Sequence, residues 1–399
     1  MTSFLKLNAF KVINHKSHEG IGIFFKLEKI DKTAICPCCG SVVDKLHQNH
    51  WRVVKDLPWG EQAVYLQVNS RQVRCDFCGK IFTEDLGIVK KNRTHTIRLT
   101  NKIISEVLSS DVKNVAKRNE VSEQEIETML QDKYDELREE KPKNLRKLGI
   151  DEIAVVKGQK NYYTVLVDLE KRVVVGIIEK RTKQEIKKYL EAWGAEVISS
   201  IEEVSIDLWQ AYKSLVKELM PQAEIIADRF HVMKQVNEEL DAERKKIKRE
   251  IKEEKDPQKK ERLLEAIEKS KYALLKNEED LKESEQEKIV IINKELPKLG
   301  EMHQQKEKFR EVFEQSNDWL EGILNLGEWL ADSKELFPDA GKTVKRWISE
   351  IIAYFDERTT QGVVEGINNK LKLIKRRAFG FRNFKNFEIR AFLTWHFSS

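Results

Sequence analysis

Cysteine is scarce in this sequence and confined to its beginning. Only five of the 399 residues are cysteine, and all five precede residue 80. A disulfide framework that stabilised a chain of this length would need cysteines along most of it, so the distribution argues against one and favours metal ligation. Internal repeats and low-complexity linkers are absent as well, which excludes a repeat architecture.

Long apolar runs and a strong excess of charge are also missing. No window approaches the roughly 18 consecutive apolar residues of a membrane-spanning helix, and the opening MTSFLKLNAFKVINH lacks the apolar core of a signal peptide. We therefore expect a cytoplasmic protein with no membrane partner. Lys and Arg number 72 against 67 Asp and Glu, a net charge of +5, so a nucleic-acid-binding surface must arise from local clusters of cations.

The cysteines include two Cys-x-x-Cys pairs, each followed by glycine. Such knuckles point two thiolates at one ion while the glycine relieves the tight turn, so four thiolates can close a tetrahedral zinc site. The gap of 35 residues (75 − 39 − 1) suits a ribbon with a hairpin between the knuckles. Reduced thiols without metal are the alternative, because Cys38 stands outside the ligand spacing. We predict a strand-rich segment over 1–90 with one structural Zn²⁺ held by Cys36, Cys39, Cys75 and Cys78.

Residues 93–142 carry apolar side chains at helical spacing and predict a helix-turn-helix domain. Ala116 is the small residue where two helices would cross, and RNEV forms the turn. Ser122 would cap the second helix, with Glu125 completing a capping box. That second helix is acidic, which disfavours a surface that faces phosphates. DNA reading by this segment and a plain pair of helices are therefore both open at this point.

Residues 145–235 predict a mixed α/β sheet. Three strand-like runs, GIDEIAVV, YYTVLVDL and RVVVGIIE, precede alternating helices and strands, which is the order of a ribonuclease-H-like fold. In that fold the first and fourth strands lie side by side, and ligands gather at their ends. Asp151 lies on the first strand and Asp207 ends the fourth, so we expect these carboxylates to meet although 56 residues (207 − 151) separate them.

Further polar residues lie near the same strand ends. Asp228 ends the fifth strand and competes as a third or accessory acid, while His231 either touches a phosphate or satisfies the core. We interpret Asp168, at the end of the second strand, and Glu152, beside Asp151, as structural or supporting residues.

The stretch 236–347 predicts a long all-α insertion. Pro257 divides its first part into two long helices, and nearly balanced charges favour a solvated pair laced by ion pairs. Residues 348–399 then predict a core-closing helix and a basic, aromatic C-terminal segment. On that helix an apolar stripe leaves Glu365 at the rim of the buried face, and Asn368 or Asn369 shares the neighbouring polar face with Lys372 and Arg376.

Basic residues dominate the C-terminal segment. From Lys370 to Arg390 eight Lys or Arg stand against one acid and alternate with phenylalanines, which suits a surface for DNA phosphates, with a solvated basic tail as the alternative. The candidate DNA-binding residues are Asn369, Lys372, Lys375, Arg376, Arg377, Arg382 and Lys385.

The acids suggest a metal site. Two-metal phosphoryl transfer needs hard oxygen ligands on a rigid frame, and Asp151, Asp207 and Glu365 meet that demand.

Three segments carry a resemblance to a known family. LGIDEIAVVKGQKNYYTVLVDL, VSIDLWQAYKSLVKELMPQAEIIADRFHVMK and VVEGINNKLKLIKRRAFGFRNFKNFEIRAF resemble, in this order, bacterial insertion-sequence transposases of the ISL-three group, which have a DDE ribonuclease-H-like core. The resemblance covers nearly the whole chain. It implies a catalytic triad of Asp151, Asp207 and Glu365 with two Mg²⁺ or Mn²⁺ ions. One departure is Gln361, where family members often carry Asn.

The resemblance also implies an activity. Such an enzyme binds the inverted-repeat ends of its element in double-stranded DNA, nicks them hydrolytically and joins the 3′-hydroxyl ends to target DNA. We expect a homodimer in the synaptic complex, in the bacterial cytoplasm at the nucleoid. Two alternatives are a zinc-ribbon and helix-turn-helix regulator without catalysis, and a structure-selective nuclease that cuts without joining.

Overall fold

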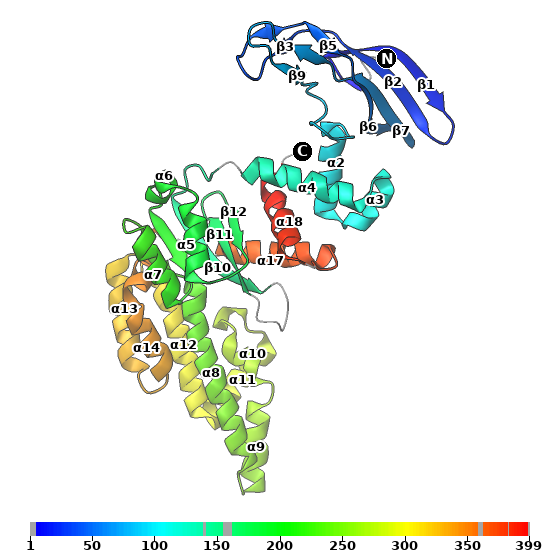
Figure 1. Ribbon diagram of the computed structural model, residues 1–399. Coiled ribbons are helices and arrows are strands. Elements are labelled where there is room, and N and C mark those ends of the chain that lie inside the picture. Colours follow the sequence, from blue (N-terminus) through cyan, green and yellow to red (C-terminus); the bar gives the residue numbers. More distant parts are fainter. Residues whose placement is uncertain (1–4, 139–140, 155–161, 358–361, 382, 398–399) are drawn as a thin grey trace. The chain divides into compact units, whose positions relative to one another are not determined.

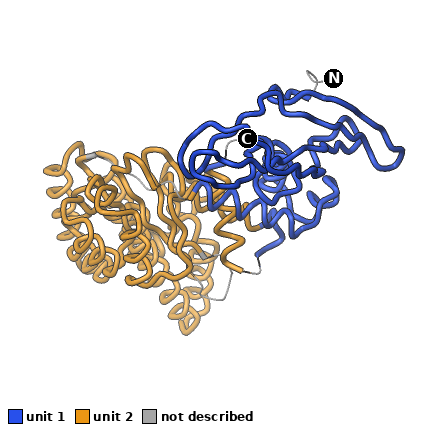
Figure 2. Tube along the Cα trace, turned by 45° about the horizontal axis from the view of Figure 1, so that its top comes forward, with its two compact units in different colours: residues 1–137, 376–381, 396–399 blue, residues 138–375, 382–395 orange. Residues whose placement is uncertain are grey.

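The contacts of the computed structural model divide the chain into two compact units (Figure 2). The described residues are 5–138, 141–154, 162–357, 362–381 and 383–397. Unit 1 comprises residues 1–137, 376–381 and 396–399, and unit 2 comprises residues 138–375 and 382–395. The finer division into five segments stays a prediction. In the described part of the chain, no helix has the length and apolar character required to cross a membrane.

Unit 1 begins with a four-stranded sheet of order β1-β2-β7-β6 (Figure 1). Its strands are β1 (Phe10–His18), β2 (Gly22–Lys29), β6 (Trp51–Trp59) and β7 (Gln62–Asn69). Buried and part-exposed residues alternate along β2 and β7, so one face packs a core that includes Phe25 and Leu66. The antiparallel hairpin of β6 and β7 lies between the cysteine knuckles, as predicted.

Short strands carry the knuckles themselves. They are β3 (Ala34–Ile35), β4 (Val42–Val43), β5 (Leu46–Gln48), β8 (Gln72–Arg74) and β9 (Ile81–Thr83). Each knuckle joins two antiparallel strands, β3 to β4 and β8 to β9. Val43 and Val73 pack with Cys36 and Cys75 in a small core, which is too small to hold this segment together by apolar burial alone.

Three helices complete unit 1: α2 (Ile97–Ser109), α3 (Val112–Asn119) and α4 (Glu123–Arg138). The predicted capping box is confirmed, because the Glu125 N–H donates to Ser122 Oγ at 3.2 Å and the Ser122 N–H donates to Glu125 Oε2 at 2.9 Å. The predicted turn was placed too early. Asn119 still belongs to α3, where its side-chain Nδ2 donates to the Val115 carbonyl, and the chain turns at Glu120 with φ 50°.

Unit 2 is built on a five-stranded sheet of order β12-β11-β10-β13-β14. The strands are β10 (Lys147–Ala154), β11 (Tyr162–Asp168), β12 (Val173–Ile178), β13 (Glu203–Ile206) and β14 (Glu224–Ala227). β10 pairs antiparallel with β11 and parallel with β13, so the first and fourth strands are neighbours, as predicted. The connecting helices are α5 (Lys183–Glu191), α6 (Ala195–Ser199) and α7 (Gln210–Leu219).

A long helical stretch follows the last strand (Figure 1). It comprises α8 (Arg229–Lys252), α9 (Pro257–Ile267), α10 (Ser270–Leu275), the 3-10 turn η1 (Glu278–Asp280), α11 (Glu283–Glu295), α12 (Pro297–Gln315), α13 (Trp319–Asp332), α14 (Pro338–Arg346), α15 (Ile348–Ile352) and α16 (Tyr354–Glu357). The expectation of two long helices around Pro257 was wrong for the second of them. Lys269 adopts φ 57° between α9 and α10, which ends the helix there.

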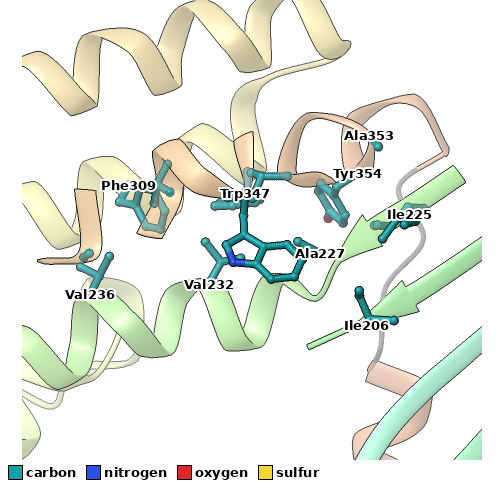
Figure 3. Packing of buried hydrophobic residues seen from close by; sticks show 14 of the residues in the cluster. Ile206, Ile225, Ala227, Val232, Val236, Phe309, Trp347, Ala353 and Tyr354 are labelled. Carbon is teal, nitrogen blue, oxygen red and sulfur yellow. The ribbon is translucent and has the colours of Figure 1, made fainter. Parts of the chain in front are cut away.

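The helical stretch shares one hydrophobic core with the sheet. α8 begins directly after β14, and Val232 of α8 is buried with Ile206 and Ala227 of the strands. Trp347 packs into this cluster beside Val232 (Figure 3). The apolar residues of the charge-dense region, such as Ile267, belong to the same core, so this region is not a purely solvated helical pair.

The last two helices are α17 (Gly362–Arg377) and α18 (Phe384–His396), which belong to unit 2 except for residues 376–377 and 396. α17 approaches β10 at Gly149, where a Cβ atom would lie 3.2 Å from Val364 Cγ2 and 2.9 Å from a Leu169 methyl carbon. A larger residue at this position would force the Leu169 side chain to move and the Val364 side chain of α17 to shift by a few tenths of an ångström, so glycine favours the close approach of the helix to the strand. The close approach fixes where the polar side chains of α17 meet the sheet.

Candidate active site and zinc site

Two carboxylates stand side by side at one edge of the unit 2 sheet. Parallel pairing aligns Ile150 with Ile206, so the next residue of each chain segment is an aspartate, Asp151 and Asp207. Asp151 is buried and Asp207 is partly exposed just beyond the end of β13. The sequence order predicted this meeting because a parallel register carries both strand ends to the same edge.

Burial disfavours the charged form of both acids. Burial is the largest of the causes that raise the pKa of Asp207 to about 6. The negative charges of Glu152 and Asp151 also raise this pKa, whereas the charge of His231 lowers it. Burial likewise raises the pKa of Asp151, although the Glu152 N–H donates to its Oδ1 at 2.7 Å. Two dehydrated carboxylates, each raised further in pKa by a neighbouring acid, form a site where a cation would be stabilised.

Asp228 and His231 form a hydrogen-bonded pair beside these acids. Asp228 caps α8, and its Oδ2 lies 2.8 Å from His231 Nδ1. Burial lowers the pKa of His231, but the bond to Asp228 and the charges of Asp151 and Asp207 outweigh burial, so that the pKa is raised. The histidine therefore faces the acidic edge as a partial counter-charge rather than as an apolar core residue.

The third predicted acid, Glu365, lies exposed in the first turn of α17. One turn further on, the buried Asn368 donates from Nδ2 to Asp151 Oδ2 at 2.6 Å, across 217 residues of sequence. Residues three apart on a helix are neighbours, so this bond brings the Glu365 side of α17 to the acidic edge. Asn368 Oδ1 is buried and has no hydrogen-bond partner among the described residues.

The three predicted catalytic acids do not form a tight metal cage. Among the described residues, the four zinc-ribbon cysteines are the only group of at least three Cys, His, Asp or Glu whose ligand atoms all lie within 4.8 Å of one another. The structure thus brings Asp151 and Asp207 together and connects α17 to them through Asn368. Their roles as catalytic and metal-binding residues remain predictions.

Two further acids have clear structural partners. Asp168 Oδ1 accepts from the backbone N–H groups of Glu170 and Lys171, so it shapes the turn between β11 and β12. Glu152 accepts from Arg181 Nη1 at 2.8 Å and from the Tyr212 hydroxyl at 3.3 Å. Both acids thus have the supporting contacts expected of them, while nothing in the sequence singled out Arg181.

The candidate DNA-binding residues differ in exposure. Asn369, Lys372, Arg376 and Arg377 are exposed on α17, whereas Lys375 and Lys385 are partly buried. Lys385 also pairs with Glu388 at 3.4 Å, which reduces its availability to phosphates. Arg382 and Gln361 lie outside the described residues.

The phenylalanines of the C-terminal segment also differ in exposure. Phe387 is buried and Phe384 packs on Tyr163, while Phe379 is 88% exposed. Some of these rings therefore contribute to the core and others lie in solvent.

The four predicted zinc ligands meet in unit 1. Cys36 Sγ lies 3.6 Å from Cys78 Sγ, and Cys39 Sγ lies 3.6 Å from Cys75 Sγ. A tetrahedral zinc with bonds of about 2.3 Å requires sulfur separations of about 3.8 Å, so this arrangement fits the ion. Hydrogen bonds from Ser41 lower the pKa of Cys39 to about 6. The Lys80 N–H lowers the pKa of Cys78, but burial and the three neighbouring thiols outweigh it and raise that pKa to about 12, so this thiol needs a metal ion to become a thiolate.

Glycines shape both knuckles as predicted. The N–H groups of Gly40 and Gly79 each donate to the carbonyl of the first cysteine of their knuckle at 2.9 Å. Their φ angles are 75° and 74°, in the left-handed region that glycine enters at little cost. Cys38 is exposed and takes no part in the cluster, in keeping with its position outside the ligand spacing.

Sequence comparisons find the same two parts. A family profile of DDE transposases of the ISL3 type matches residues 148–391, and a profile described as the zinc-finger of transposase IS204/IS1001/IS1096/IS1165 matches residues 32–78. The transposase for insertion sequence element IS1001 of Bordetella parapertussis is 28% identical over 370 residues, which cover 91% of this chain and 89% of the relative. The IS1557 transposase of Mycobacterium tuberculosis is 27% identical over 354 residues, covering 84% and 78%.

The mixed sheet, its paired acids and the cysteine ribbon are thus parts of an insertion-sequence transposase. Within that class, the chain belongs to the ISL3 family of DDE transposases, as the resemblance of its motifs implied.

Replacing one zinc ligand should release the metal. We expect Cys75→Ser to contain well under one zinc per chain and to lose protection of the amides in residues 34–83, because zinc binding stabilises this small core. Elemental analysis and hydrogen exchange measure both effects. Cys38→Ser is the matched control and should keep one zinc per chain. Full zinc content in Cys75→Ser would contradict the assignment.

The raised pKa of Asp207 predicts a pH-dependent stability. Because the folded-state pKa lies near 6 and the ordinary value near 3.8, the folded unit binds more protons than the unfolded chain between these values, and the free energy of unfolding falls as pH rises through them. Without divalent ions, Asp207→Asn should stabilise unit 2 at pH 7.5 by on the order of 1 to 3 kcal/mol. Urea unfolding monitored by hydrogen exchange measures the difference.

Acid should remove that difference. Near pH 4 both proteins carry a neutral side chain at position 207, so their stabilities should converge. Asp339→Asn, an exposed aspartate of α14, serves as the control and should change stability little at either pH. A stabilisation by Asp207→Asn that is equal at pH 4 and pH 7.5 would mean that the charge is not its cause.

Proposed function

We propose that this protein is a DDE transposase that binds the inverted-repeat ends of its insertion sequence, cleaves them by metal-dependent hydrolysis and joins the 3′-hydroxyl ends to target DNA. The parallel register of β10 and β13 carries the proposal, because it aligns Asp151 with Asp207 at one sheet edge. The strand order β12-β11-β10-β13-β14 supports a ribonuclease-H-like core. The relatives named as transposases of IS1001 and IS1557 support the same activity.

The acidic edge has the properties expected of a site for divalent ions. Burial raises the pKa values of Asp151 and Asp207, and nearby acids add to the effect, Asp228 at Asp151 and Glu152 with Asp151 at Asp207, so a cation would relieve both. The buried Asn368 Oδ1, without a partner in the described residues, adds a further hard oxygen. In our proposal Asp151, Asp207 and Glu365 would hold two Mg²⁺ or Mn²⁺ ions, which would supply Lewis-acid stabilisation of negative charge on the reacting phosphate.

Neighbouring residues hold the two proposed catalytic aspartates in place. Asp151 is held by Asn368 and by the Glu152 N–H, so its carboxylate has little rotational freedom. The Trp209 N–H donates to Asp207 Oδ1 at 3.0 Å and fixes the second acid. In our proposal His231, with its raised pKa, would stabilise negative charge on a phosphate. Water attacks the phosphodiester at the element end, and the freed 3′-hydroxyl then attacks target DNA.

Several surfaces of the chain would bind double-stranded DNA in this proposal. The exposed cations of α17 provide phosphate contacts next to Glu365. The zinc ribbon and the three helices α2 to α4, as a helix-turn-helix domain, would contribute end recognition. Because each of two element ends needs one active site, we expect a homodimer in the synaptic complex.

Removal of any one catalytic acid should separate binding from chemistry. We expect Asp151→Asn, Asp207→Asn and Glu365→Gln each to lower cleavage and joining by several orders of magnitude, because ligands of one metal site act as a unit. Binding to a labelled fragment with the inverted repeats of the element should change less than a few-fold. Gel assays with Mn²⁺ measure all three steps.

Asp339→Asn is a suitable control for these variants because its carboxylate is exposed on α14, and it should cleave and join like the parent. A parent protein that binds the repeats without cutting would support the regulator, and one that cuts without joining would support the nuclease. Undiminished strand transfer by all three acid variants would refute the proposed triad.

Two neighbouring asparagines should have opposite effects. Asn368 is buried against Asp151, so Asn368→Ala should weaken Mn²⁺ binding on the order of tenfold and leave DNA affinity nearly unchanged. Asn369 is exposed on the cationic side of α17, so Asn369→Ala should weaken DNA binding and leave Mn²⁺ binding intact. Electron paramagnetic resonance of Mn²⁺ and fluorescence anisotropy of labelled DNA measure the two affinities. Equal effects of both variants on Mn²⁺ would contradict a specific role for Asn368.

A further inference from the structure

Arg181 lies between two aromatic rings close to the paired acids. It follows β12 and directly precedes Thr182, the N-cap of α5. The guanidinium carbon is 5.0 Å from the centre of the Tyr162 ring and 5.5 Å from that of the Trp209 ring. We call these three residues the arginine platform.

Both acids have a chain neighbour in contact with the platform. Arg181 Nη1 donates to Glu152, which directly follows Asp151 on β10. Trp209 belongs to the platform through its ring and contacts Asp207 through its backbone N–H. The platform is therefore anchored to the chain at both predicted catalytic strands. A DNA strand whose phosphate reached Asp151 and Asp207 would have its next nucleotide near these side chains.

Stability alone does not explain this arrangement. The Arg181 side chain is 50% exposed and Tyr162 is 38% exposed, and exposed ion pairs and cation–π contacts contribute little to folding. The single hydrogen bond of Arg181 in the described part of the chain uses Nη1, which leaves Nε and Nη2 available. A guanidinium presents its donors in a planar fork that matches phosphate oxygens, and aromatic faces stack on bases.

We propose that the arginine platform binds the nucleotide next to the scissile phosphate. Arg181 donates to the neighbouring phosphate, and the base of that nucleotide, unpaired from its complement, stacks on an aromatic ring of the platform. The ligand is thus a DNA strand with a locally opened end rather than an intact duplex. This assignment rests on the proposed function, because it requires that the strand be cleaved at Asp151 and Asp207.

The first test removes the contact between Arg181 and the neighbouring phosphate, once by changing the protein and once by changing the DNA. Arg181→Ala should slow cleavage of an element-end fragment by on the order of tenfold or more, because the strand is less well positioned. It should also reduce the slope of log affinity against log salt by about 0.7, the loss of one phosphate contact on an unpaired strand. With an uncharged methylphosphonate at the neighbouring position, the parent should slow to the rate of the variant, and Arg181→Ala should lose nothing further.

A matched control is available in the same unit. Arg146 has a similarly exposed side chain, at 54%, and an ion pair with Glu202 at the same distance of 2.8 Å, but it precedes the other end of β10. Arg146→Ala should cleave within about twofold of the parent and respond normally to the methylphosphonate. An equal loss in Arg146→Ala and Arg181→Ala would overturn the proposal.

Two variants separate phosphate binding from neutralisation of Glu152. Arg181→Lys keeps the charge but loses the planar fork, so it should recover less than half of the lost cleavage rate. Glu152→Gln combined with Arg181→Ala removes the charge that Arg181 neutralises, and we expect it to stay as slow as Arg181→Ala. Full recovery in the double variant would show that Arg181 only balances Glu152, and full recovery in Arg181→Lys would show that the planar fork is not used; either result would overturn the proposal.

Base stacking has its own readout. With 2-aminopurine at the nucleotide next to the scissile phosphate, the parent should quench the fluorescence on binding, and Tyr162→Ala with Trp209→Ala should not. Unchanged quenching would refute the stacking.

If the parent neither cleaved the fragment nor bound it, the proposed function would fail. If it cleaved while Arg181→Ala matched it, only the platform assignment would fail.

Discussion

The parallel pairing of β10 with β13 is the constraint on which the candidate active site depends. Its register places Ile150 beside Ile206 in the buried core, and the next position of each segment is an aspartate. Because side chains alternate along a strand, a slip of one residue would turn Asp151 to the opposite face and bury Glu152 in its place. The apolar residues of β10 and β13 therefore determine not only the fold but also which carboxylates meet.

The paired acids are costly to the protein that contains them. Burial and repulsion from neighbouring acids raise their pKa values. His231 lowers both pKa values through its charge, and the Asn368 amide lowers that of Asp151 through a hydrogen bond. Asn368 donates one hydrogen bond to Asp151 but buries a carbonyl oxygen that has no partner in the described residues, at a cost of about 1 to 3 kcal/mol. A site selected for stability alone would not contain these groups, whereas a site for cations would.

Short sequence patterns predicted much of this arrangement. They did not predict the features that depend on how distant elements are rotated and packed against one another. The knuckle glycines, the Ser122 capping box and the strand order follow from short patterns whose physics is contained within a few residues. The sequence also indicated that Glu365 lies at the rim of a buried helix face. It could not distinguish Asn368 from Asn369, because that choice depends on how α17 is rotated about its axis against Gly149. Arg181 was missed because no periodic pattern marks a loop residue whose partners come from β10, β11 and the start of α7.

The alternation of β10 also divides the polar residues of the site between two helical layers. Asp151 faces α17, where it meets Asn368, while Glu152 faces the opposite side, where it meets Tyr212 of α7 and Arg181. The two neighbours on one strand therefore connect the acidic edge to the cationic helix on one side and to the aromatic rings on the other. A DNA strand lying across this edge would have cations of α17 on one flank and Arg181 on the other. Because both flanks are attached to the same two residues of β10, a shift of that strand would move the acids and both sets of contacts together, and under the proposed function this would keep the scissile phosphate in register with the carboxylates.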